Sequence, residues 1–564
     1  MGTTERTAAR GRTGEPGSER SGAGPRPAAT GTGTGTGTAT DAARWRVPGV
    51  AVLVVVPLYV LWALALATGG GDLAAQFAWA GFASRHPGSA YNLSWYGGMH
   101  TANYSLLAPP LMAVFGVRAV TVAAGLGASW ALGRLCVRAG VRWPAAVSVL
   151  GSLVLWCNVA SGRTTFALGV AIGLVALLYV RHRPGVAAGC TALATAASPV
   201  AGLFLVVAGG AYGLDRQWRR AAVLLVPPFV VVAATTLLFP FTGEQPMAMG
   251  RLWMPLAACA ALWLGAPREG GWRVVRFASL VYGAGVVLTF LIPSPIGTNV
   301  ERLVGLAGPP VLLAAALAVL AGWARGGWLL RVRAVLLVGM LAYNTGWLVD
   351  KTDDDLRVST TVPAWAAHTD GVVAELRRLG AERTRVEVVP ARNHREAAVL
   401  APHVNMARGW NRQLDVERGR LFYGRTTPAP AAYRAWLDRW GVGLVVLHNG
   451  RPDGPAEAEA DLVRRGTDWL EPVWHDADWR IYRVQGAVPL VSAPGAVVRG
   501  DDASVVVRMP AAGSVTVRIA YSPWLRADGG GCVRQDGEWT RLTVPRGGEY
   551  RLDAPYRLWP FGSC

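Results

Sequence analysis

The sequence predicts a mainly α-helical, multi-span membrane protein that carries a C-terminal α/β domain and a small β-sandwich. Of its 564 residues, 52% are hydrophobic and only 16% are charged. Apolar runs recur from Val50 to Val349 between short arginine-containing connections, a pattern typical of polytopic membrane proteins. From about Asp350 the chain changes to short strand-like and helix-like segments between Gly and Pro turns, which predicts folded domains outside the bilayer.

The N-terminal segment, residues 1–43, is rich in Gly, Thr, Ser, Pro and Arg and includes the stretch "TGTGTGTGTAT". It has no apolar periodicity from which a core could form, so we expect a disordered cytoplasmic tail. The first apolar run is long and lacks a clear small-residue cleavage site. We therefore predict a retained membrane anchor rather than a cleaved signal peptide.

The membrane region, residues 44–349, divides into about eleven predicted spans when it is cut at arginines and turn residues. A break at Ser198 and Pro199 splits one short pair, because a single span there would put the next arginines on the wrong side. The predicted spans are 48–67, 118–136, 144–158, 164–180, 186–197, 199–213, 221–240, 251–265, 275–292, 301–322 and 332–349.

Arginine is distributed unevenly between the two sides of this membrane region. With a cytoplasmic N-terminus, the inner connections hold sixteen arginines and the outer connections five. Positive charge concentrates in cytoplasmic loops, so we expect a bacterial plasma-membrane protein whose C-terminal domain is extracytoplasmic. The formal net charge of +19 reflects these scattered arginines, with Lys351 as the single lysine. No basic run with interleaved aromatic residues occurs, which argues against nucleic-acid binding.

Two folded parts are predicted after the last span. Residues 350–487 contain the buried strands "TRVEVVP" and "GVGLVVLHN" and the edge strand "WRIYRV" between helical segments, which indicates an α/β domain. Residues 488–564 alternate apolar and polar positions, which indicates a small β-sandwich. In an oxidising exterior, Cys532 and Cys564 are a candidate disulfide. No CxxC or HExxH motif occurs, so we predict neither a metal nor another cofactor.

The first outer loop, residues 68–117, opens with "GGGD" and holds a single acid, Asp72. A carboxylate just beyond a span could act as a general base toward an acceptor hydroxyl. The same residue could instead cap the helix that begins at Leu73, or do both. We expect that helix to lie in the membrane interface with its rings at headgroup level, and expect Pro109 and Pro110 to start a second interfacial helix.

The rest of this loop, "YNLSWYGGMHTANYSLLAPPL", is rich in aromatic and polar residues but has no acid. His100 could be a second catalytic group or a structural hydrogen-bonding residue. The neighbouring side chains could shape a sugar site, or the aromatic ones could form a membrane-interface belt without a ligand. The candidates for substrate contact are Tyr91, Trp95, Tyr96, Asn103 and Tyr104.

Two later outer turns, "NVASGRTTF" and "PSPIGTNVERLVGL", bring cations to the same side of the membrane. Arg163, Asn299 and Arg302 could bind the phosphate of a lipid, because an arginine near the bilayer boundary needs an anion. Alternatively, Arg302 pairs with Glu301 or another acid, or reaches water. In the tail, "PARNHREAAVLAPHVNMARGWNRQLDVERGRLFYG" could contact an acceptor or form the interface between domain and membrane.

Together these features resemble the GT-C superfamily of polytopic membrane glycosyltransferases. The resemblance rests on "GGGD" after the first span, "YSLLAPPLMAVFG" before the second, the short middle spans and "GTNVERL" at the start of a late span. The stretches "SGRTTFALG", "ASPVAGLF" and "ARGWNRQLD" are similar to uncharacterised actinobacterial membrane proteins, some with a domain named as related to 6-pyruvoyl-tetrahydropterin synthase. Many relatives have a second acid in the first loop, whereas Asp72 stands alone there.

The resemblance implies transfer of a sugar from a polyprenyl phosphate to a cell-envelope glycan or lipid acceptor. Asp72 and His100 would be catalytic, and the loop side chains, Arg163, Asn299 and Arg302 would bind substrate. Two other classes stay open: a non-catalytic envelope protein that binds a glycan or protein partner, and a transporter or lipid flippase. No matched pair of interrupted spans is visible in the two halves, which argues against the transporter.

Overall fold

Every apolar run that predicts a span forms a helix in the computed structural model, which describes residues 36–324, 327–424 and 428–558. Helices suit such runs because they satisfy all backbone hydrogen bonds within the segment. Proline stands at the start of three of them, α5, α7 and α8, where its missing N–H costs nothing. The helices are α1 (Thr36–Leu61, continued by the π-turn η1, Trp62–Leu66), α4 (Val117–Arg138), α5 (Pro144–Ala160), α6 (Thr164–Tyr179), α7 (Pro184–Ala197), α8 (Pro199–Leu214), α9 (Trp218–Leu238), α10 (Trp253–Gly265), α11 (Trp272–Leu291), α12 (Glu301–Leu320) and α13 (Trp328–Ser359).

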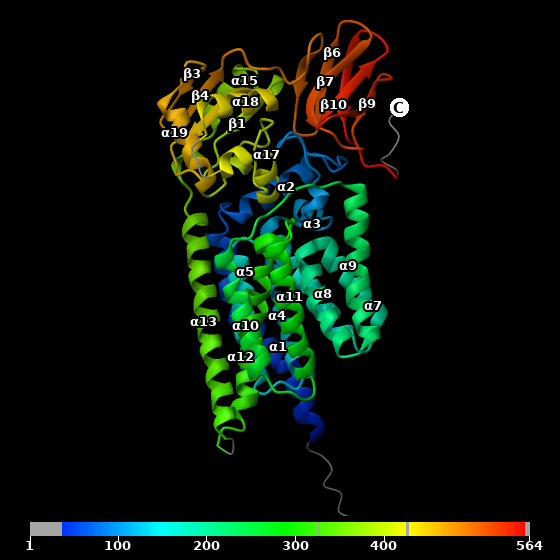
Figure 1. Cartoon of the computed structure of the whole chain (residues 1–564), viewed down its shortest axis with the longest axis vertical. Coiled ribbons are helices and arrows are strands. Elements are labelled where there is room, and N and C mark those ends of the chain that lie inside the picture. Colours follow the sequence, from blue (N-terminus) through cyan, green and yellow to red (C-terminus); the bar gives the residue numbers. More distant parts are fainter. Residues whose placement is uncertain (1–35, 325–326, 425–427, 559–564) are drawn as a thin grey trace, which may run out of the picture. The chain divides into compact units, whose positions relative to one another are not determined.

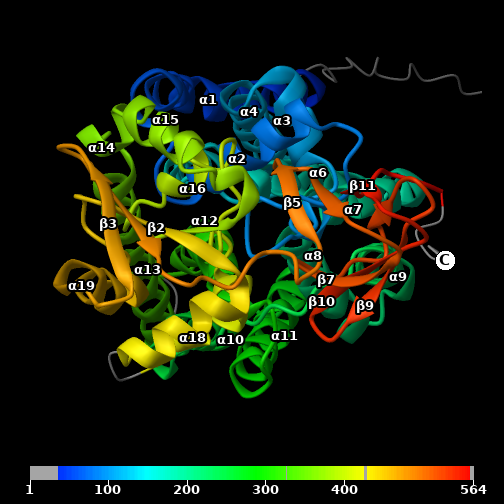
Figure 2. The same ribbon diagram turned by 90° about the horizontal axis from the view of Figure 1, so that it is seen from above.

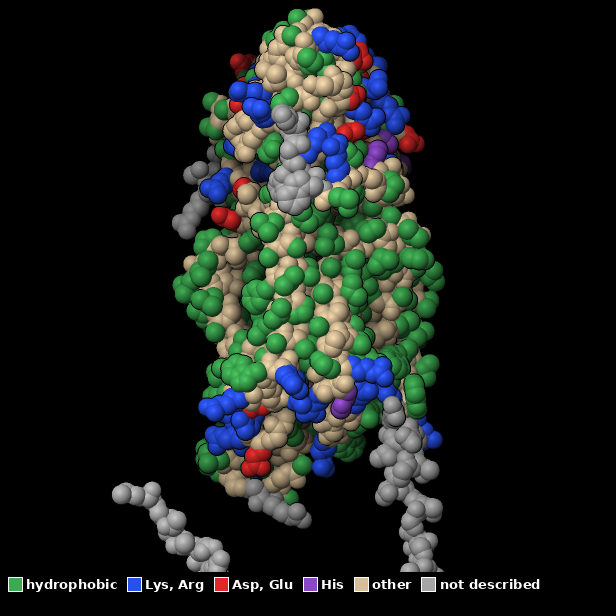
Figure 3. Space-filling view, turned by 90° about the vertical axis from the view of Figure 1, so that its right-hand side faces the viewer, with side chains coloured by type: hydrophobic (Ala, Val, Ile, Leu, Met, Phe, Trp, Pro, Cys, Tyr) green, Lys and Arg blue, Asp and Glu red, His purple; other side chains and the backbone are tan. Residues whose placement is uncertain are grey.

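The described part of the chain has six helices that are long and apolar enough to cross a bilayer. They lie at Trp45–Leu66, Val117–Arg138, Trp218–Leu238, Trp272–Leu291, Gly297–Leu320 and Trp328–Ser359. Four further apolar helices are shorter, with 10–17 residues. On the face seen in Figure 3, hydrophobic side chains form a band across the middle, and Lys and Arg side chains gather beyond this band at both ends. The chain is therefore a multi-pass membrane protein, while the count of eleven spans stays a prediction.

Helix boundaries differ from the prediction at two places. The predicted disordered tail 1–43 lies largely outside the described residues, but its end, from Thr36, belongs to α1. Residues 43–564 form one unit, and residues 1–42 are a separate unit. Helix α13 continues beyond the predicted end of its span at 349 to Ser359. These added turns are polar, and they carry Lys351 and Asp355.

Two short helices in the first long loop pack on the end of the helical bundle (Figure 1). They are α2 (Asp72–Arg85) and α3 (Ala108–Phe115). We predicted that the aromatic rings of α2 would lie at the headgroup level of the membrane; the depth of the helix stays a prediction, but two of these rings, Trp79 and Phe82, are buried within the protein. Trp79 is 1% exposed and belongs to a hydrophobic core shared with the α/β domain. The ring is buried because that domain covers α2.

The α/β domain contains a four-stranded sheet of order β1-β2-β4-β3. Strands β1 and β2 pair in parallel, and the other neighbours are antiparallel. The strands are β1 (Arg385–Val388), β2 (Val442–His448), β3 (Leu470–His475) and β4 (Trp479–Val484). The helices are α14 (Ala364–Ala367), α15 (Asp370–Arg378), α16 (Glu396–Val399), α17 (Arg412–Arg418), α18 (Pro430–Trp440) and α19 (Glu457–Arg465). Short 3-10 turns complete the chain at η2 (Thr101–Asn103), η3 (Met249–Arg251), η4 (Gly297–Val300), η5 (Ala381–Arg383), η6 (Arg420–Tyr423) and η7 (Gly454–Ala456).

Two small sheets share one hydrophobic core where the sequence predicts a β-sandwich. One has the order β7-β10-β9 and the other β5-β6-β11-β8, and all pairings are antiparallel. The strands are β5 (Ala496–Gly500), β6 (Ser504–Met509), β7 (Gly513–Ala520), β8 (Arg526–Ala527), β9 (Cys532–Asp536), β10 (Trp539–Val544) and β11 (Gly548–Asp553). The predicted partner of Cys532, Cys564, lies outside the described residues, so that disulfide stays a prediction.

The first long loop joins the helical bundle to both strand domains, which lie above the bundle in Figure 1 and side by side in the view from above in Figure 2. Tyr91 donates a hydrogen bond from its hydroxyl to the carbonyl of Ala520 at 2.9 Å. The backbone N–H of Met406, in the α/β domain, donates to the carbonyl of Ser94 at 2.6 Å. The loop therefore acts as the shared support of both domains.

Candidate functional site

A charged cavity of about 160 Å³ lies at the end of the bundle that faces the strand domains. Its walls come from the starts of α2, α6 and α12, the end of α5, the segment before α10 and the polar turns of α13. The lining residues are Asp72, Val154, Asn158, Arg163, Gln245, Arg251, Thr298, Asn299, Glu301, Arg302, Gly305, Leu306, Trp347, Leu348 and Lys351. Four predicted site residues, Asp72, Arg163, Asn299 and Arg302, are among them.

The first charge centre of the cavity is Asp72 between two arginines. Its Oδ2 lies 3.7 Å from Nε of Arg163 and 3.9 Å from Nη2 of Arg302. Both separations are too long for hydrogen bonds. The guanidinium groups therefore attract the Asp72 carboxylate electrostatically, but they do not donate hydrogen bonds to it. Arg163 donates instead to Oδ2 of Asp355 at 3.0 Å. Asp72 keeps 34% of its side chain exposed, so a ligand in the cavity can reach it.

Two glycines bring Asp72 and Arg163 together. Gly71, at φ +63°, holds the N-cap position of α2, so Asp72 is the first helical residue. The predicted cap by Asp72 is therefore wrong by one position. Gly162, at φ +77°, approaches α2 so closely that an added Cβ would lie 2.9 Å from the backbone nitrogen of Leu73. Only glycine permits both this backbone conformation and this contact.

The second charge centre is Glu301, which the sequence presented only as a possible partner of Arg302. Its Oε2 lies 3.3 Å from Nη1 of Arg251 and 3.1 Å from Nζ of Lys351. The Glu301 side chain is only 4% exposed. Its other oxygen, Oε1, has no hydrogen-bond partner among the described residues. Of the alternatives predicted for Arg302, the acid that it faces is Asp72, with Nη2 3.9 Å from Oδ2, and not Glu301.

The charges that line the cavity favour an anionic ligand. Four lining side chains are cationic, from Arg163, Arg251, Arg302 and Lys351, whereas two are carboxylates. Fixed cations at the edge of a low-dielectric region attract anions more strongly than the same groups in water. Arg251, Lys351 and Asp355 were not predicted as site residues. Lys351 is the single lysine of the chain and lies directly after a predicted span. That position could have identified it as a site residue from the sequence.

A polar side chain from the α/β domain, that of Gln413, reaches the rim of this cavity. Asn299 donates from Nδ2 to Oε1 of Gln245 at 2.9 Å, and Gln413 donates from Nε2 to the same oxygen at 3.3 Å. Gln413 also donates to the carbonyl of Pro295 at 3.1 Å. Gln413 lies on α17, so the position of this helix sets the position of the rim.

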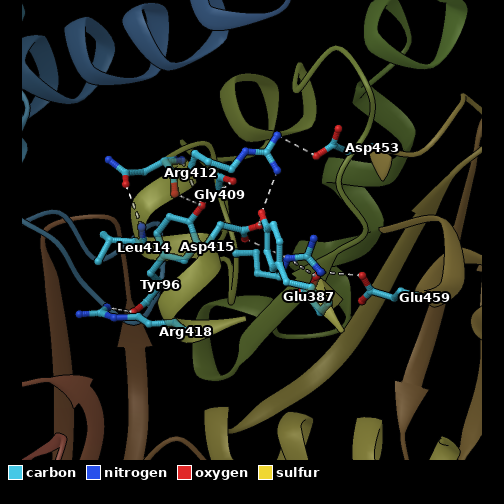
Figure 4. A network of polar contacts seen from close by, with 12 residues as sticks. Tyr96, Glu387, Gly409, Arg412, Leu414, Asp415, Arg418, Asp453 and Glu459 are labelled. Carbon is cyan, nitrogen blue, oxygen red and sulfur yellow. Dashed lines mark hydrogen bonds and ion pairs between the residues drawn. The ribbon is translucent and has the colours of Figure 1, made fainter. Parts of the chain in front are cut away.

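Helix α17 is held by a buried ionic network that Figure 4 shows. Arg408 is 1% exposed and contacts Glu459 at 2.8 Å, Asp415 at 3.2 Å and Glu387 at 3.8 Å. Burial and the adjacent carboxylate of Glu459 raise the pKa of Glu387 well above its usual range. A protonated Glu387 removes one of three negative charges around a single guanidinium, which makes the buried cluster tolerable.

The same segment fastens the α/β domain to the first long loop. Tyr96 donates from its hydroxyl to the carbonyl of Gly409 at 2.7 Å and accepts from the backbone N–H of Asn411 at 3.1 Å. Arg418 donates to the carbonyls of Tyr96 and Gly98. The sequence predicted that this segment either contacts an acceptor or forms the interface between the α/β domain and the membrane part. These contacts belong to such an interface.

His100 does not line the cavity, contrary to the prediction of a catalytic role. Its Nδ1 lies 2.9 Å from the carbonyl of Ala90, and its Nε2 lies 3.1 Å from Oγ of Ser522 in the C-terminal sheets. Burial lowers the pKa of His100 to about 4. The loop turns back on those sheets, so His100 is a neutral structural residue between them.

The loop side chains proposed for sugar contact also lie outside the cavity lining. Tyr91, Trp95 and Tyr96 are at most 3% exposed, because both strand domains pack on the loop. Burial raises the pKa of Tyr91 to about 12, which keeps its hydroxyl protonated. Asn103 donates to the carbonyl of Pro240 at 3.3 Å. Tyr104 is the exception in position: its ring centre lies 4.0 Å from that of Trp79 at a tilt of 49°, and its hydroxyl interacts electrostatically with Arg302 and Asp72.

A second cavity, of about 300 Å³, is almost wholly apolar and lies within the helical bundle. Helices α6, α8, α10, α11 and α12 line it. Leu306 lines both cavities, and Leu303 of the apolar cavity follows Arg302 of the charged one. The charged and the apolar cavity are therefore neighbours.

Within the described residues, no group of three or more His, Cys, Asp or Glu side chains is placed to hold a metal ion. Glu301 and Asp72 each face cations instead.

Comparisons with known proteins give limited similarities. A family model described as a domain of unknown function, DUF8823, matches residues 492–531. No curated protein matches the chain. The cryo-EM structure of the arabinofuranosyltransferase AftD from Mycobacteria is similar at 14% identity and a TM-score of 0.38, over 84% of this chain and 41% of that one. The crystal structure of ArnT from Cupriavidus metallidurans bound to undecaprenyl phosphate is similar at 15% identity and a TM-score of 0.38, over 78% of this chain and 98% of that one. The chain spans less than half the length of AftD, and function must be derived from the residues of its own cavity.

Proposed function

We propose that the protein is a membrane glycosyltransferase that moves a sugar from a polyprenyl-phosphate donor to a hydroxyl of a cell-envelope acceptor. The observation that carries the proposal is Asp72 facing two arginines in a cationic cavity that adjoins an apolar one. The cationic cavity suits the phosphate and sugar, and the apolar cavity suits part of the polyprenyl chain. The arginine distribution of the sequence supports an orientation in which the charged cavity and both strand domains face the outside of a bacterial plasma membrane.

In this mechanism Asp72 is the general base. Its carboxylate takes the proton of the acceptor hydroxyl as that oxygen bonds to the anomeric carbon of the sugar. The bond from the anomeric carbon to the phosphate oxygen breaks, and its electron pair leaves with the polyprenyl phosphate. Attack opposite the leaving group inverts the configuration at the anomeric carbon.

Arg163 and Arg302 stabilise the leaving group. The donor is a phosphodiester with one negative charge, whereas the released monoester carries nearly two. Preorganised guanidinium groups bind this developing charge more strongly than the charge of the substrate, which lowers the barrier. Asp355 holds one side of Arg163 at 3.0 Å and directs the guanidinium into the cavity.

The acceptor, the sugar and the finer resemblance to actinobacterial membrane proteins stay predictions. Hexosyl and pentosyl transfer are both compatible with the charged cavity, because neither its volume nor its charges distinguish between them.

The test is transfer of a radiolabelled sugar from a polyprenyl-phosphate donor to endogenous acceptors in membranes that contain Asp72→Asn. Loss of a general base slows such reactions by about 10²–10⁴-fold. Asp354→Asn is the matched control, because Asp354 is exposed on α13. Wild-type transfer by Asp72→Asn would remove Asp72 from the mechanism, and no transfer by the wild type would remove the proposed function.

A further inference from the structure

Glu301 is a buried carboxylate with one occupied and one unoccupied oxygen. Arg251 and Lys351 both contact Oε2, at 3.3 and 3.1 Å. Oε1 has no hydrogen-bond partner among the described residues, although the Glu301 side chain lines the charged cavity and is only 4% exposed. A buried oxygen without a donor is costly, so this position favours a ligand that supplies one.

The chemistry around Glu301 differs from that around Asp72. Arg251 and Lys351 contact the carboxylate of Glu301 at hydrogen-bond range, so each already has an acceptor there. Arg163 and Arg302 lie 3.7 and 3.9 Å from Asp72, beyond hydrogen-bond range, and keep N–H groups available for a phosphate. The unpaired Oε1 of Glu301 instead needs a hydrogen-bond donor, which a phosphate diester lacks and a neutral hydroxyl supplies.

A sugar hydroxyl is a neutral group that fits both kinds of atom at this position. Its O–H can donate to Oε1 of Glu301, and its oxygen can accept from Lys351 or Arg251. Gln245 and Asn299 add amide groups to the same wall. Trp347 also lines the cavity, with Nζ of Lys351 5.0 Å from its ring centre, and its indole ring can offer apolar contact to the C–H groups of a sugar.

We propose that Glu301, Arg251 and Lys351 form the subsite that binds hydroxyl groups of the transferred sugar, with Trp347 as its apolar wall. The inference rests on the proposed function and refines it. In this arrangement the sugar lies at Glu301 and not at the aromatic residues of the first long loop. The cavity then has a phosphate side around Arg163 and Arg302 and a sugar side around Glu301.

The experiment compares a polyprenyl phosphate without a sugar with polyprenyl phosphates that carry one. Binding of undecaprenyl phosphate, and of undecaprenyl phosphates that carry a pentose or a hexose, is measured on the purified full chain in nanodiscs. Glu301→Gln keeps the volume of the side chain but removes its charge. We expect it to weaken binding of the best glycosylated lipid by about tenfold or more and to leave undecaprenyl phosphate within about twofold.

Two further variants keep the result interpretable. Arg302→Gln should weaken binding of both lipids, because it acts on the phosphate. Trp347→Leu should weaken only the glycosylated lipid, and it tests the subsite independently if Glu301→Gln does not fold.

Equal effects of Glu301→Gln on both lipids, or no effect on either, would overturn the sugar subsite and leave the proposed function standing. If the wild type bound neither lipid, the proposed function would fail and the subsite with it.

Discussion

Asp72 and Arg163, which belong to different loops of the chain, face each other across 3.7 Å from Oδ2 to Nε. This separation leaves both groups attracted but free to bind a ligand. Arg163 is also held by Asp355 at 3.0 Å. A base and an anion-binding group therefore lie in one cavity without neutralising each other by a direct hydrogen bond.

Arg163→Gln is expected to impair donor binding. The substitution removes a cation beside the phosphate and leaves Asp355 without its partner, so the KM for a polyprenyl-phosphate sugar should rise by about tenfold or more. Initial rates of transfer at varied donor concentration would measure this. Arg357→Gln is the matched control, because Arg357 is 75% exposed and pairs only with Asp353 among the described acids. Equal KM and kcat values for both variants and the wild type would contradict a phosphate role for Arg163.

Protonation of His100 should make the protein less stable in mild acid. Burial lowers its pKa from 6.5 to about 4, so the folded state binds fewer protons than the unfolded state between these values. The stabilisation is complete above pH 6.5 and is lost as the pH falls toward 4, by up to about 3 kcal/mol. Melting temperatures measured from pH 4 to pH 7 should fall more steeply in the wild type than in His100→Gln. Parallel curves would mean that His100 does not titrate in this way. Burial also lowers the pKa of His448 to about 4, but His448 is present in both proteins and so does not contribute to the difference between them.

Tyr96→Phe should reduce stability while leaving donor recognition intact. The Tyr96 hydroxyl links Gly409 and Asn411 to the first long loop. Removing it leaves buried backbone groups unpaired, at a cost of about 1–3 kcal/mol. A thermal melt should show a lower melting temperature, and donor KM at a permissive temperature should equal that of the wild type. A selective rise in KM would return Tyr96 to the substrate site.

Ala208→Trp should block the apolar cavity, which Ala208 lines. A large ring there would exclude part of a polyprenyl chain, so binding of undecaprenyl phosphate should weaken by about tenfold. Ala233→Trp, at an exposed position of α9, is the matched control. A short-chain polyprenyl phosphate should bind to wild type and Ala208→Trp alike. If Ala208→Trp bound the long-chain lipid as the wild type does, the cavity would not hold the chain.

The sequence predicted helices well because their signals are local. The run at 199–213 corresponds to α8 (Pro199–Leu214), and the run at 118–136 corresponds to α4 (Val117–Arg138). The aromatic loop was less predictable. A ring that suits a membrane interface also suits a core, and Trp95 is buried only because the α/β domain packs on it.

Part of the candidate site was also predictable. Three of its residues, Asp72, Arg163 and Arg302, are charged and lie beside predicted spans. A charged group there is costly to desolvate, so its presence in an apolar region indicates a functional site. Glu301 was visible too, but its partners were not. Arg251 and Lys351 reach it from separate helical segments, and no spacing along the chain encodes that meeting.

The sequence by itself determined which segments are helices and where prolines and glycines start and end them. Apolar run length and backbone hydrogen bonding decide these properties within each segment. Only the tertiary structure decided which charges meet. Asp72 takes Arg163 and Arg302, Glu301 takes Arg251 and Lys351, and His100 is removed to the C-terminal sheets. Such pairings depend on the packing of distant helices and domains, because charge interactions act through space rather than along the chain.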